Sequence, residues 1–237
     1  MALTVIWGFS FVFIKVAGDF LDPYQVSLGR IFFGALLLYI FLIATKRKPI
    51  TSGPAIKHLA LSAMLAQAIP FALFAWAEKS ISSVAAGLIN STTSLWTGLI
   101  AFMILPSEKL TQKKTIGLAI GFIGIVVLLG VWDAQFRGSW QAYSACIIST
   151  LGYGVSTLWT RRNLSPLKLD PISAMATQLT IATIAIGTVS LAVSPKPTHY
   201  PLNGVLSIIT LGALGTGVAL VLNFMIVQRA DALTAST

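Results

Sequence analysis

Leu21-Asp22-Pro23 opens one long apolar segment of the chain, and Leu169-Asp170-Pro171 opens another one 148 residues later. Each triplet follows a shorter apolar stretch and precedes a further pair of apolar stretches. The residues at 72–79 have a weak echo at 219–226, one to three residues out of register. We interpret these similarities as an internal repeat, and a repeated bundle of membrane helices is a common plan of secondary transporters.

The composition requires much of the molecular surface to face lipid. Hydrophobic residues make up 56% of the 237 residues and charged residues only 10%, and the mean hydropathy is +0.85. A soluble domain carries about 25% charged residues, so this chain cannot cover a globule of its size with polar side chains. The apolar runs are too long for strands, and lipid permits only helices or closed barrels. We therefore predict an all-α membrane protein, a polytopic helical bundle.

Apolar runs of about 20 residues predict eight spans of the membrane. They cover roughly residues 2–17, 24–45, 58–77, 82–104, 115–132, 140–160, 172–193 and 204–226. Eleven Lys and Arg residues lie in the even-numbered loops or after the last span, and four lie on the other side. By the positive-inside rule the eleven are cytoplasmic, so the amino terminus is also expected in the cytoplasm.

The repeat has a consequence for topology. A first repeat over residues 1–132 contains five predicted spans, and a second over residues 138–237 contains three spans and the start of another. Because five is odd, the second repeat enters the membrane from the opposite side. We predict two inverted-topology repeats, the second incomplete, whose halves can expose a central site to alternate sides of the membrane.

Several other classes of function find no support in the sequence. The net charge of +9 comes from short Lys and Arg clusters between apolar runs, which favours topology signals over a nucleic-acid partner. Cys146 is the single cysteine, and His58 and His199 are isolated, so neither an internal disulfide nor a metal site is expected. The sequence shows no nucleophile–base pairing and no glycine loop for phosphates. We predict no enzyme and no cofactor.

Several motifs, taken in order, resemble a known family. They are Trp7-Gly8-Phe9-Ser10-Phe11 followed by Lys15, Leu28-Gly29-Arg30-Ile31-Phe32-Phe33, Ala77-Glu78-Lys79, Asn90-Ser91-Thr92-Thr93-Ser94-Leu95-Trp96-Thr97, and Glu108-Lys109-Leu110-Thr111 with Gly117, Gly121 and Gly124. In this order and spacing they resemble the EamA-type branch of the drug/metabolite transporter superfamily over essentially the whole chain. The resemblance implies a multi-pass inner-membrane secondary transporter that exports small metabolites, such as amino acids or similar polar or amphipathic solutes, by alternating access.

The chain departs from the pattern of that family in two ways. Ser94 stands where many relatives have proline, which predicts a straighter fourth helix. The family usually has ten helices, whereas this chain stops at Thr237, where a ninth helix should begin. An alternative is therefore a truncated paralogue that does not transport, or a membrane partner subunit. A second copy could restore the missing wall, which makes a homodimer possible alongside the lipid bilayer and a small-molecule substrate as partners.

Three charged residues are candidates for the substrate pathway. Arg30 lies inside a span, where a charge costs about 2.5–3.5 kcal/mol and is rarely without function. It would contact a substrate anion or lock two helices together, unless it snorkels to the outer headgroups. Lys15 ends the first span, where snorkelling is favoured, although the resemblance implies a place at the outer mouth. Glu78 is a possible partner of Arg30 and a possible proton carrier, and a solvated loop charge is the favoured alternative.

A run of small polar residues occupies the middle of the fourth span. Helical spacing places Asn90, Thr93, Ser94 and Thr97 on one face. This face is either a tight interface with another helix or a hydrogen-bonding wall of the solute cavity, and the sequence does not separate the two.

Further candidates come from residues that are unusual in a span. Gln67 and Trp76 are candidates for the cavity lining, and Pro70 should kink the third span as a hinge. Trp7 is expected to anchor at the membrane interface, as are Trp132, Trp140 and Trp159. Tyr153 and Asn223 are pathway candidates in the second half, although interhelical bonds are favoured for them and for Gln178. Gly117, Gly121 and Gly124 share a face that predicts close packing inside the bundle, with dimerisation as the alternative.

Overall fold

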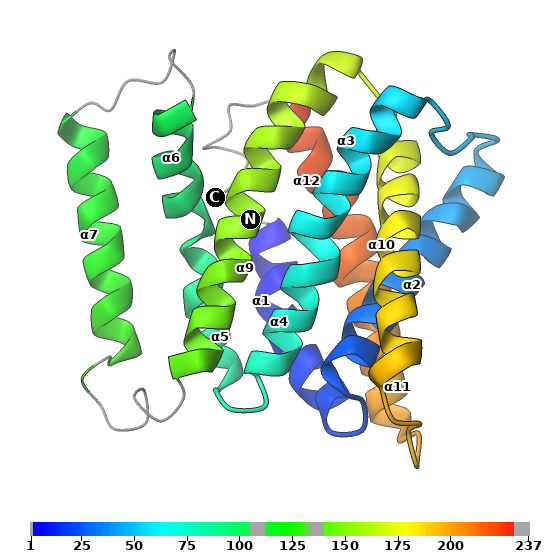
Figure 1. The fold of residues 1–237 in the computed structure, drawn as a ribbon, viewed down its shortest axis with the longest axis horizontal. Helices are drawn as coiled ribbons and strands as arrows, with labels where there is room; N and C mark the ends of the chain where they lie inside the picture. The colour runs from blue at the N-terminus through cyan, green and yellow to red at the C-terminus, as the bar shows by residue number, and fades with distance from the viewer. Residues whose placement is uncertain (1, 105–111, 131, 133–139, 230–237) are drawn as a thin grey trace.

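The computed structural model describes residues 2–104, 112–130, 132 and 140–229, and every regular element among them is helical (Figure 1). This confirms the predicted all-α bundle. In chain order the elements are α1 (Ala2–Gly18), α2 (Pro23–Ala44), α3 (Gly53–Ala63), the π-helix η1 (Met64–Ala68), α4 (Ile69–Ala77), α5 (Ser83–Ser91), α6 (Thr93–Ile104), α7 (Gln112–Leu129), α9 (Trp140–Trp159), the π-helix η2 (Thr160–Leu164), the 3₁₀-helix η3 (Ser165–Leu167), α10 (Pro171–Val193), α11 (Leu202–Gly212), the π-helix η4 (Ala213–Val218) and α12 (Ala219–Arg229).

Four helical stretches are long and apolar enough to cross a membrane. They are Pro23–Ala44, Gly53–Ala77, Pro171–Val193 and Leu202–Gln228. The other predicted spans also form helices of the same bundle: α1 and α7 are shorter and apolar, α9 runs along α4 and α6, and the fourth span is divided into α5 and α6. The predicted start of a ninth helix lies outside the described residues.

The division of the fourth span corrects the expectation of a straighter helix. α5 ends at Ser91 and α6 begins at Thr93, with Thr92 between them. The Thr92 hydroxyl donates to the carbonyl of Ile89 at 2.6 Å, and the Ser91 hydroxyl donates to the carbonyl of Leu88 at 2.6 Å. Hydroxyls that bond to the preceding turn compete with the helix ladder and bend it. The run of small polar residues therefore interrupts this span without a proline.

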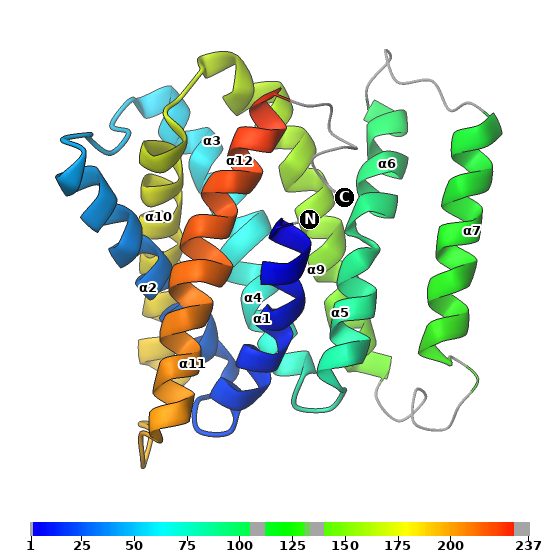
Figure 2. The same cartoon turned by 180° about the vertical axis from the view of Figure 1, so that it is seen from behind.

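The two Asp-Pro sequences start α2 and α10 at opposite ends of the bundle. Asp22 and Asp170 are the N-caps, and a proline follows each in the first turn, where its missing N–H is no loss. Figures 1 and 2 show α2 rising from the lower edge and α10 descending from the upper edge. This is the arrangement that inverted repeats require, while the division of the chain into two repeats stays a prediction.

The π-helices η1 and η4 lie inside two spans at matching places. A shift of 148 residues carries η1 onto residues 212–216, which share residues 213–216 with η4. Near η1 the local cause is Pro70, which has no N–H to continue the α-helical ladder, and the N–H of Ile69 instead reaches back to the carbonyl of Met64. π-helical turns of this kind are frequent at functional sites.

The interior contains two apolar clusters. One gathers around α2, α3 and α10 and includes Ile31, Leu59 and Leu179, each fully buried. The other gathers around α1, α4 and α9 and includes Phe74 and Cys146. Large apolar side chains also cover the outer surface, with Ile43, Ile184 and Leu191 exposed by 77%, 66% and 88%. An outer surface of this kind suits lipid.

α2 approaches η4 very closely through glycines. A Cβ placed on Gly34 would lie 3.0 Å from the carbonyl oxygen of Gly212 and 3.1 Å from the amide nitrogen of Gly217. Small residues allow two membrane helices to approach in this way. The contact brings the backbone of η4 within reach of Arg30, one turn before Gly34 on α2.

Candidate functional site

A cavity of about 1460 Å³ lies among the helices of both halves of the chain. Its walls come from α1, α2, η1, α4, α5, α6, α9, η2, α10 and α12. Most of the lining is apolar, but Arg30, Gln67 and Gln178 all reach it and are exposed by only 5%, 1% and 4%. Sites for small molecules combine these features: an apolar enclosure and a few placed polar groups.

Arg30 is held in the cavity wall by two contacts. Its Nε donates to the hydroxyl of Thr216 in η4 at 3.2 Å, and its guanidinium carbon lies 3.6 Å from the centre of the Phe71 ring. The Thr216 hydroxyl donates in turn to the carbonyl of Leu211 at 3.1 Å, which fixes its direction. Arg30 therefore has the predicted interhelical contact and also lines the cavity.

Gln178 and Gln67 form the second polar contact of the cavity. The Gln178 Nε2 donates to the Gln67 Oε1 at 2.7 Å, which joins α10 to η1 and confirms the expected interhelical bond of Gln178. The Gln178 Oε1 is buried and has no hydrogen-bond partner among the described residues. An unsatisfied buried acceptor costs about 1–3 kcal/mol of stability.

Arg30 and Gln178 occupy equivalent positions of the proposed repeats. A shift of 148 residues carries Arg30 on α2 onto Gln178 on α10. Arg30 bonds to Thr216 in η4, and Gln178 bonds to Gln67 in η1. Each long helix therefore contacts the π-helix of the other half. The two equivalent side chains differ in charge, because Arg30 is cationic and Gln178 is neutral.

Aromatic side chains surround these polar groups. Tyr153 stacks on Phe74 with ring centres 6.1 Å apart and meets Phe71 edge-on at 6.5 Å. Tyr153 and Asn223 both line the cavity, and their role in the pathway stays a prediction. Trp7 corrects the expectation of an interface anchor, because its Nε1 donates to the carbonyl of Gly215 in η4 at 3.2 Å and its ring also lines the cavity.

The polar face of the fourth span serves both roles that the sequence left open. Asn90, Thr93 and Ser94 line the cavity. Thr97 is fully buried, and its backbone lies 3.2 Å from the place where a Cβ on Gly154 would stand. The first turns of the face thus form a cavity wall, and its far end is a helix interface.

Lys15, Trp76 and Glu78 do not line this cavity, and their pathway role stays a prediction. Trp76 is 45% exposed on the outer side of α4. The Lys15 Nζ donates to the backbone carbonyl of Glu78 at 2.6 Å, and the Glu78 Oε2 accepts from the Ser83 hydroxyl at 2.8 Å. Glu78 follows the span Gly53–Ala77 and is only 2% exposed. Burial raises the pKa of its carboxyl to about 7.

The glycines of α7 contribute less to packing than predicted. A Cβ on Gly121 would lie 2.8 Å from the side chain of Leu95, so α7 passes close to α6 there. Gly117 and Gly124 have no described atom within 4 Å of the corresponding place. Pro70 follows η1 directly, so its predicted hinge role coincides with a real irregularity of the backbone.

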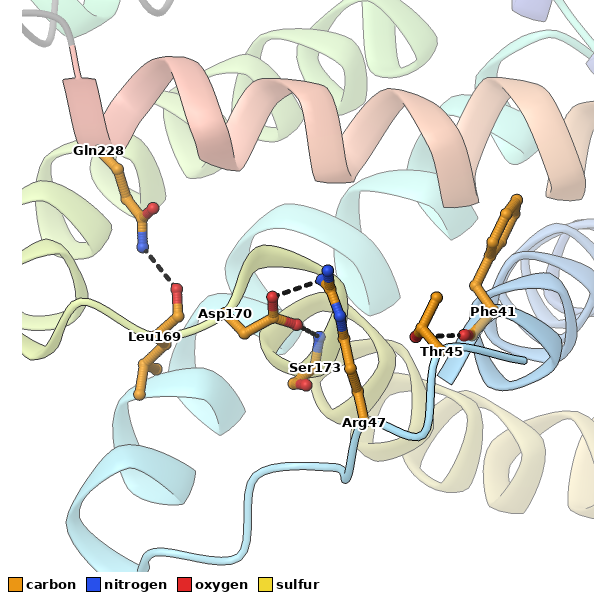
Figure 3. Close-up of polar contacts among 7 residues, drawn as sticks. All are labelled: Phe41, Thr45, Arg47, Leu169, Asp170, Ser173 and Gln228. Atoms are coloured by element: carbon orange, nitrogen blue, oxygen red, sulfur yellow. Dashed lines mark hydrogen bonds and ion pairs between the residues drawn. The ribbon is translucent and has the colours of Figure 1, made fainter. Parts of the chain in front are cut away.

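Polar contacts link the start of α10 to its neighbours at the upper end of the bundle (Figure 3). Arg47, in the loop after α2, pairs with the Oδ1 of Asp170 at 2.6 Å, while the Oδ2 of Asp170 accepts from the N–H of Ser173. Ile50 in the same loop donates its N–H to the Thr177 hydroxyl at 2.9 Å. The Gln228 Nε2 of α12 donates to the carbonyl of Leu169 at 3.0 Å.

At the lower end a neutral contact lies at the equivalent place. The Asp22 carboxylate accepts from the N–H groups of Tyr24 and Gln25, and the Gln25 side chain reaches back to the N–H of Asp22. The Gln25 Nε2 also donates to the carbonyl of Pro195, in the loop after α10, at 2.6 Å. Pro195 corresponds to Arg47 by the shift of 148 residues.

Sequence reasoning missed Thr216, Phe71 and Trp7 as parts of the site. Applying the repeat shift to Arg30 would have pointed to Gln178 as its counterpart in the cavity. Nothing local marks Thr216, because its position depends on the close approach of α2 to η4. Within the described part of the chain, no group of three or more His, Cys, Asp or Glu side chains could hold a metal ion.

Comparison with known proteins identifies the relatives of this chain. The profile of the EamA-like transporter family matches residues 1–130. The chain is 22% identical to the "Uncharacterized transporter YoaV" of Bacillus subtilis over its whole length and 80% of that protein. It is 24% identical to the "Uncharacterized inner membrane transporter YedA" of Escherichia coli K12, with 92% of this chain and 70% of that one covered. A crystal structure with 17% identity and a TM-score of 0.74 covers 99% of this chain and 79% of its own, which shows the shared fold.

Proposed function

The chain belongs to the EamA-like transporter family and is a multi-pass membrane protein, and from this premise we propose that it exports small metabolites across the inner membrane by alternating access. The solutes are amino acids or similar polar or amphipathic molecules. The observation that carries the proposal is the cavity of about 1460 Å³ with buried Arg30, Gln67 and Gln178 in its wall. Buried polar groups of this kind in a membrane bundle mark solute pathways.

The contacts at the two ends support alternating access. Arg47 and Asp170 link one end, and Gln25 and Pro195 link the equivalent place at the other end. Each link joins the N-terminus of a long helix to the loop of the other half. Rocking of one half against the other would open one link while it keeps the second closed. We place the Arg47 end in the cytoplasm, together with the amino terminus.

The sequence has no glycine loop for nucleotide phosphates, so we assign the driving force to a proton or solute gradient rather than to ATP. Pro70 and the π-helix η1 next to it would supply a hinge within the third span. Such irregular turns absorb changes of backbone angle at the ends of rigid segments. The two-repeat division at residues 1–132 and 138–237 belongs to the same proposal.

Counterflow in proteoliposomes tests the proposal. The purified protein is reconstituted with a panel of unlabelled metabolites inside, and uptake of the labelled compounds is measured. We expect flux for at least one small polar solute and its loss in Gln67→Leu, which removes a buried polar group of the cavity. Thr188→Val is the matched control, because Thr188 is exposed on α10 and its hydroxyl bonds only to its own helix.

Two outcomes count against the proposal. Absence of flux across the whole panel, from protein that is monodisperse and helical, would favour the alternative of a non-transporting membrane subunit. Crosslinking in the membrane would then show whether a second copy is its partner. Equal flux in Gln67→Leu and the wild type would remove the cavity from the pathway.

A further inference from the structure

We infer that Glu78 and Ser83 form a proton-binding site that controls the contact between α1 and α5. Figure 2 shows the two helices side by side at the lower end of the bundle, and Phe11 of α1 and Ser83 of α5 both line the cavity. A proton on Glu78 holds the two helices together, and its loss loosens this wall of the cavity. The inference rests on the proposed function only in its link to transport, for which it names the residue that a proton would use.

The Ser83 hydroxyl has two acceptors and a single proton to donate. Its Oγ lies 2.8 Å from the Oε2 of Glu78 and 3.2 Å from the carbonyl oxygen of Phe11. Glu78 lies in the turn just before α5, whereas Phe11 belongs to α1. A hydrogen bond to a charged acceptor is about twice as strong as a neutral one. The ionised Glu78 carboxylate therefore takes the hydroxyl proton, and the bond between α5 and α1 is lost.

A proton on Glu78 reverses this choice. A protonated carboxyl has an O–H group that donates to the Ser83 Oγ, and the Ser83 hydroxyl then donates to the carbonyl of Phe11. Three groups in a row are satisfied in this way, with every bond running in the same direction. Direct access to Glu78 is not needed, because Ser83 lines the cavity. Water that enters the cavity gives a proton to the Ser83 Oγ, and Ser83 passes its own proton to the Oε2 of Glu78.

The neutral form of Glu78 is favoured by its burial. Its side chain is only 2% exposed, and its Oε1 has no hydrogen-bond partner among the described residues. The nearby Lys15 does not neutralise the carboxylate by an ion pair, because its Nζ donates to the backbone carbonyl of Glu78 instead. A buried carboxylate without a paired cation is costly, and a proton removes that cost.

Charged and titratable groups face Glu78 from four helices. Lys15 of α1 and Arg30 of α2 are cations that favour the carboxylate, and the Ser83 hydroxyl of α5 also favours it. Cys146 of α9 is the fourth group, and its thiol is fully buried. Burial outweighs the groups that favour the ion and raises the pKa of Glu78 to about 7, so both forms are populated near neutral pH.

Infrared difference spectroscopy on the purified protein in detergent measures this proton through the carbonyl stretch of the protonated carboxyl. From about pH 5 to about pH 9 we expect a band that titrates near neutral pH in the wild type and is absent in Glu78→Gln. Asp19→Asn is the matched control, because Asp19 is exposed in the turn after α1, and it should keep the band. In Ser83→Ala the midpoint should rise, since the carboxylate loses a donor.

The contact between α1 and α5 is measured by labelling of Gly87→Cys with a thiol reagent. A Cβ on Gly87 would lie 3.5 Å from the Phe11 ring, which is an ordinary contact distance. Cys146 is fully buried, so the wild type serves as the blank. Relative to the same cysteine in Glu78→Gln, labelling should be about two- to tenfold faster at about pH 8 than at about pH 6, because one hydrogen bond is lost.

The ratio to Glu78→Gln removes the effect of pH on the ionisation of the cysteine thiol. In Ser83→Ala this ratio should not depend on pH, because the hydroxyl that changes its acceptor is missing. A purely structural role of Ser83 would shift the labelling rate equally at all pH values.

The outcomes separate this inference from the proposed function. Absence of a band that titrates in this range, or its persistence in Glu78→Gln, would overturn the proton site even if metabolite flux is measured. A titrating band with a labelling ratio that is independent of pH would overturn the control of the contact between α1 and α5. Both signals in a protein that shows no flux would support the inference and count against transport alone.

Discussion

At each end of the bundle a contact links the start of a long helix to a loop, but the two contacts differ in chemistry. At both ends an aspartate caps a long helix and a proline follows it. At the Asp22 end the linking side chain comes from the helix, because Gln25 of α2 donates to the carbonyl of Pro195. At the Asp170 end Ser173 takes the place of Gln25, and its side chain is too short to contact the opposite loop. The linking side chain there comes from the loop, because Arg47 pairs with Asp170. The two ends thus share the geometry of a link and differ in its charge.

Because the two contacts differ in charge, we expect ionic strength and pH to affect the two ends differently. The Arg47–Asp170 pair is exposed by 44% and 36%, and pairs of this kind contribute about 0–1 kcal/mol and weaken with salt. The Gln25–Pro195 bond is neutral and insensitive to salt. The Asp22 end instead has the buried Glu78 nearby, whose equivalent at the other end is Ile226. One end therefore responds to ionic strength and the other to pH.

Locking each end should have the largest effect. In a Cys146→Ser background, cysteines at 47 and 170 joined by a short bifunctional thiol reagent should abolish flux, and reductant should restore it. The pair at 25 and 195 should behave in the same way, since alternating access needs both ends to open. Full flux with one end completely crosslinked would show that this end stays closed during the cycle. Single-cysteine variants treated with the same reagent are the controls.

Glu78 should give the Asp22 end a dependence on pH. Burial raises the pKa of its carboxyl from 4.5 to about 7, against the opposing effects of Ser83, Lys15 and Arg30. The folded state then binds the proton more tightly than the unfolded state, so stability should fall as pH rises from about 4.5 to 7. The full loss is up to about 3 kcal/mol. Thermal unfolding in detergent at pH 5 and pH 8 measures this loss.

Glu78→Gln keeps the shape of the side chain and removes its titration. Its unfolding temperature should change much less than that of the wild type between the two pH values. An equal decline in both proteins would assign the pH dependence to another group. Ser83→Ala complements this test, because loss of the hydrogen bond to the Glu78 carboxylate should steepen the decline.

Salt should give the smallest effect, at the Asp170 end alone. Raising the ionic strength from 0.05 to about 1 M shortens the Debye length to about 3 Å, which should weaken the Arg47–Asp170 pair by less than about 1 kcal/mol. Hydrogen exchange at the start of α10 should quicken, while exchange at the start of α2 stays constant. In Arg47→Gln the salt effect should vanish. The retained bond between Ile50 and Thr177 limits the size of the change.

Much of the fold could be read from local patterns. The apolar runs predicted the helices to within a few residues, and the Asp-Pro caps predicted the starts of α2 and α10. Seven of the ten pathway candidates line the cavity, including Arg30, Gln67 and Tyr153. The polarity of these residues was the signal, because a polar group inside a span is costly unless it faces a partner or a cavity.

Other features depended on contacts between distant residues. Lipid is as apolar as the protein interior, so the apolar residues of a span do not reveal which face points inward. Trp76 on the outer side of α4 and Trp7 inside the bundle show this, because the sequence assigned each to the opposite environment. The break at Thr92 likewise reflects competition between hydroxyls and the helix ladder, which helix length alone does not register.

The sequence by itself determined a helical membrane bundle and the places where its long helices start. These properties follow from composition and from hydrogen bonds within one turn of chain. Only the tertiary structure decided that Arg30 would meet Thr216 and Phe71. That arrangement exists because Gly34 lets α2 approach Gly212 and Gly217, and such close contacts arise only when distant segments pack.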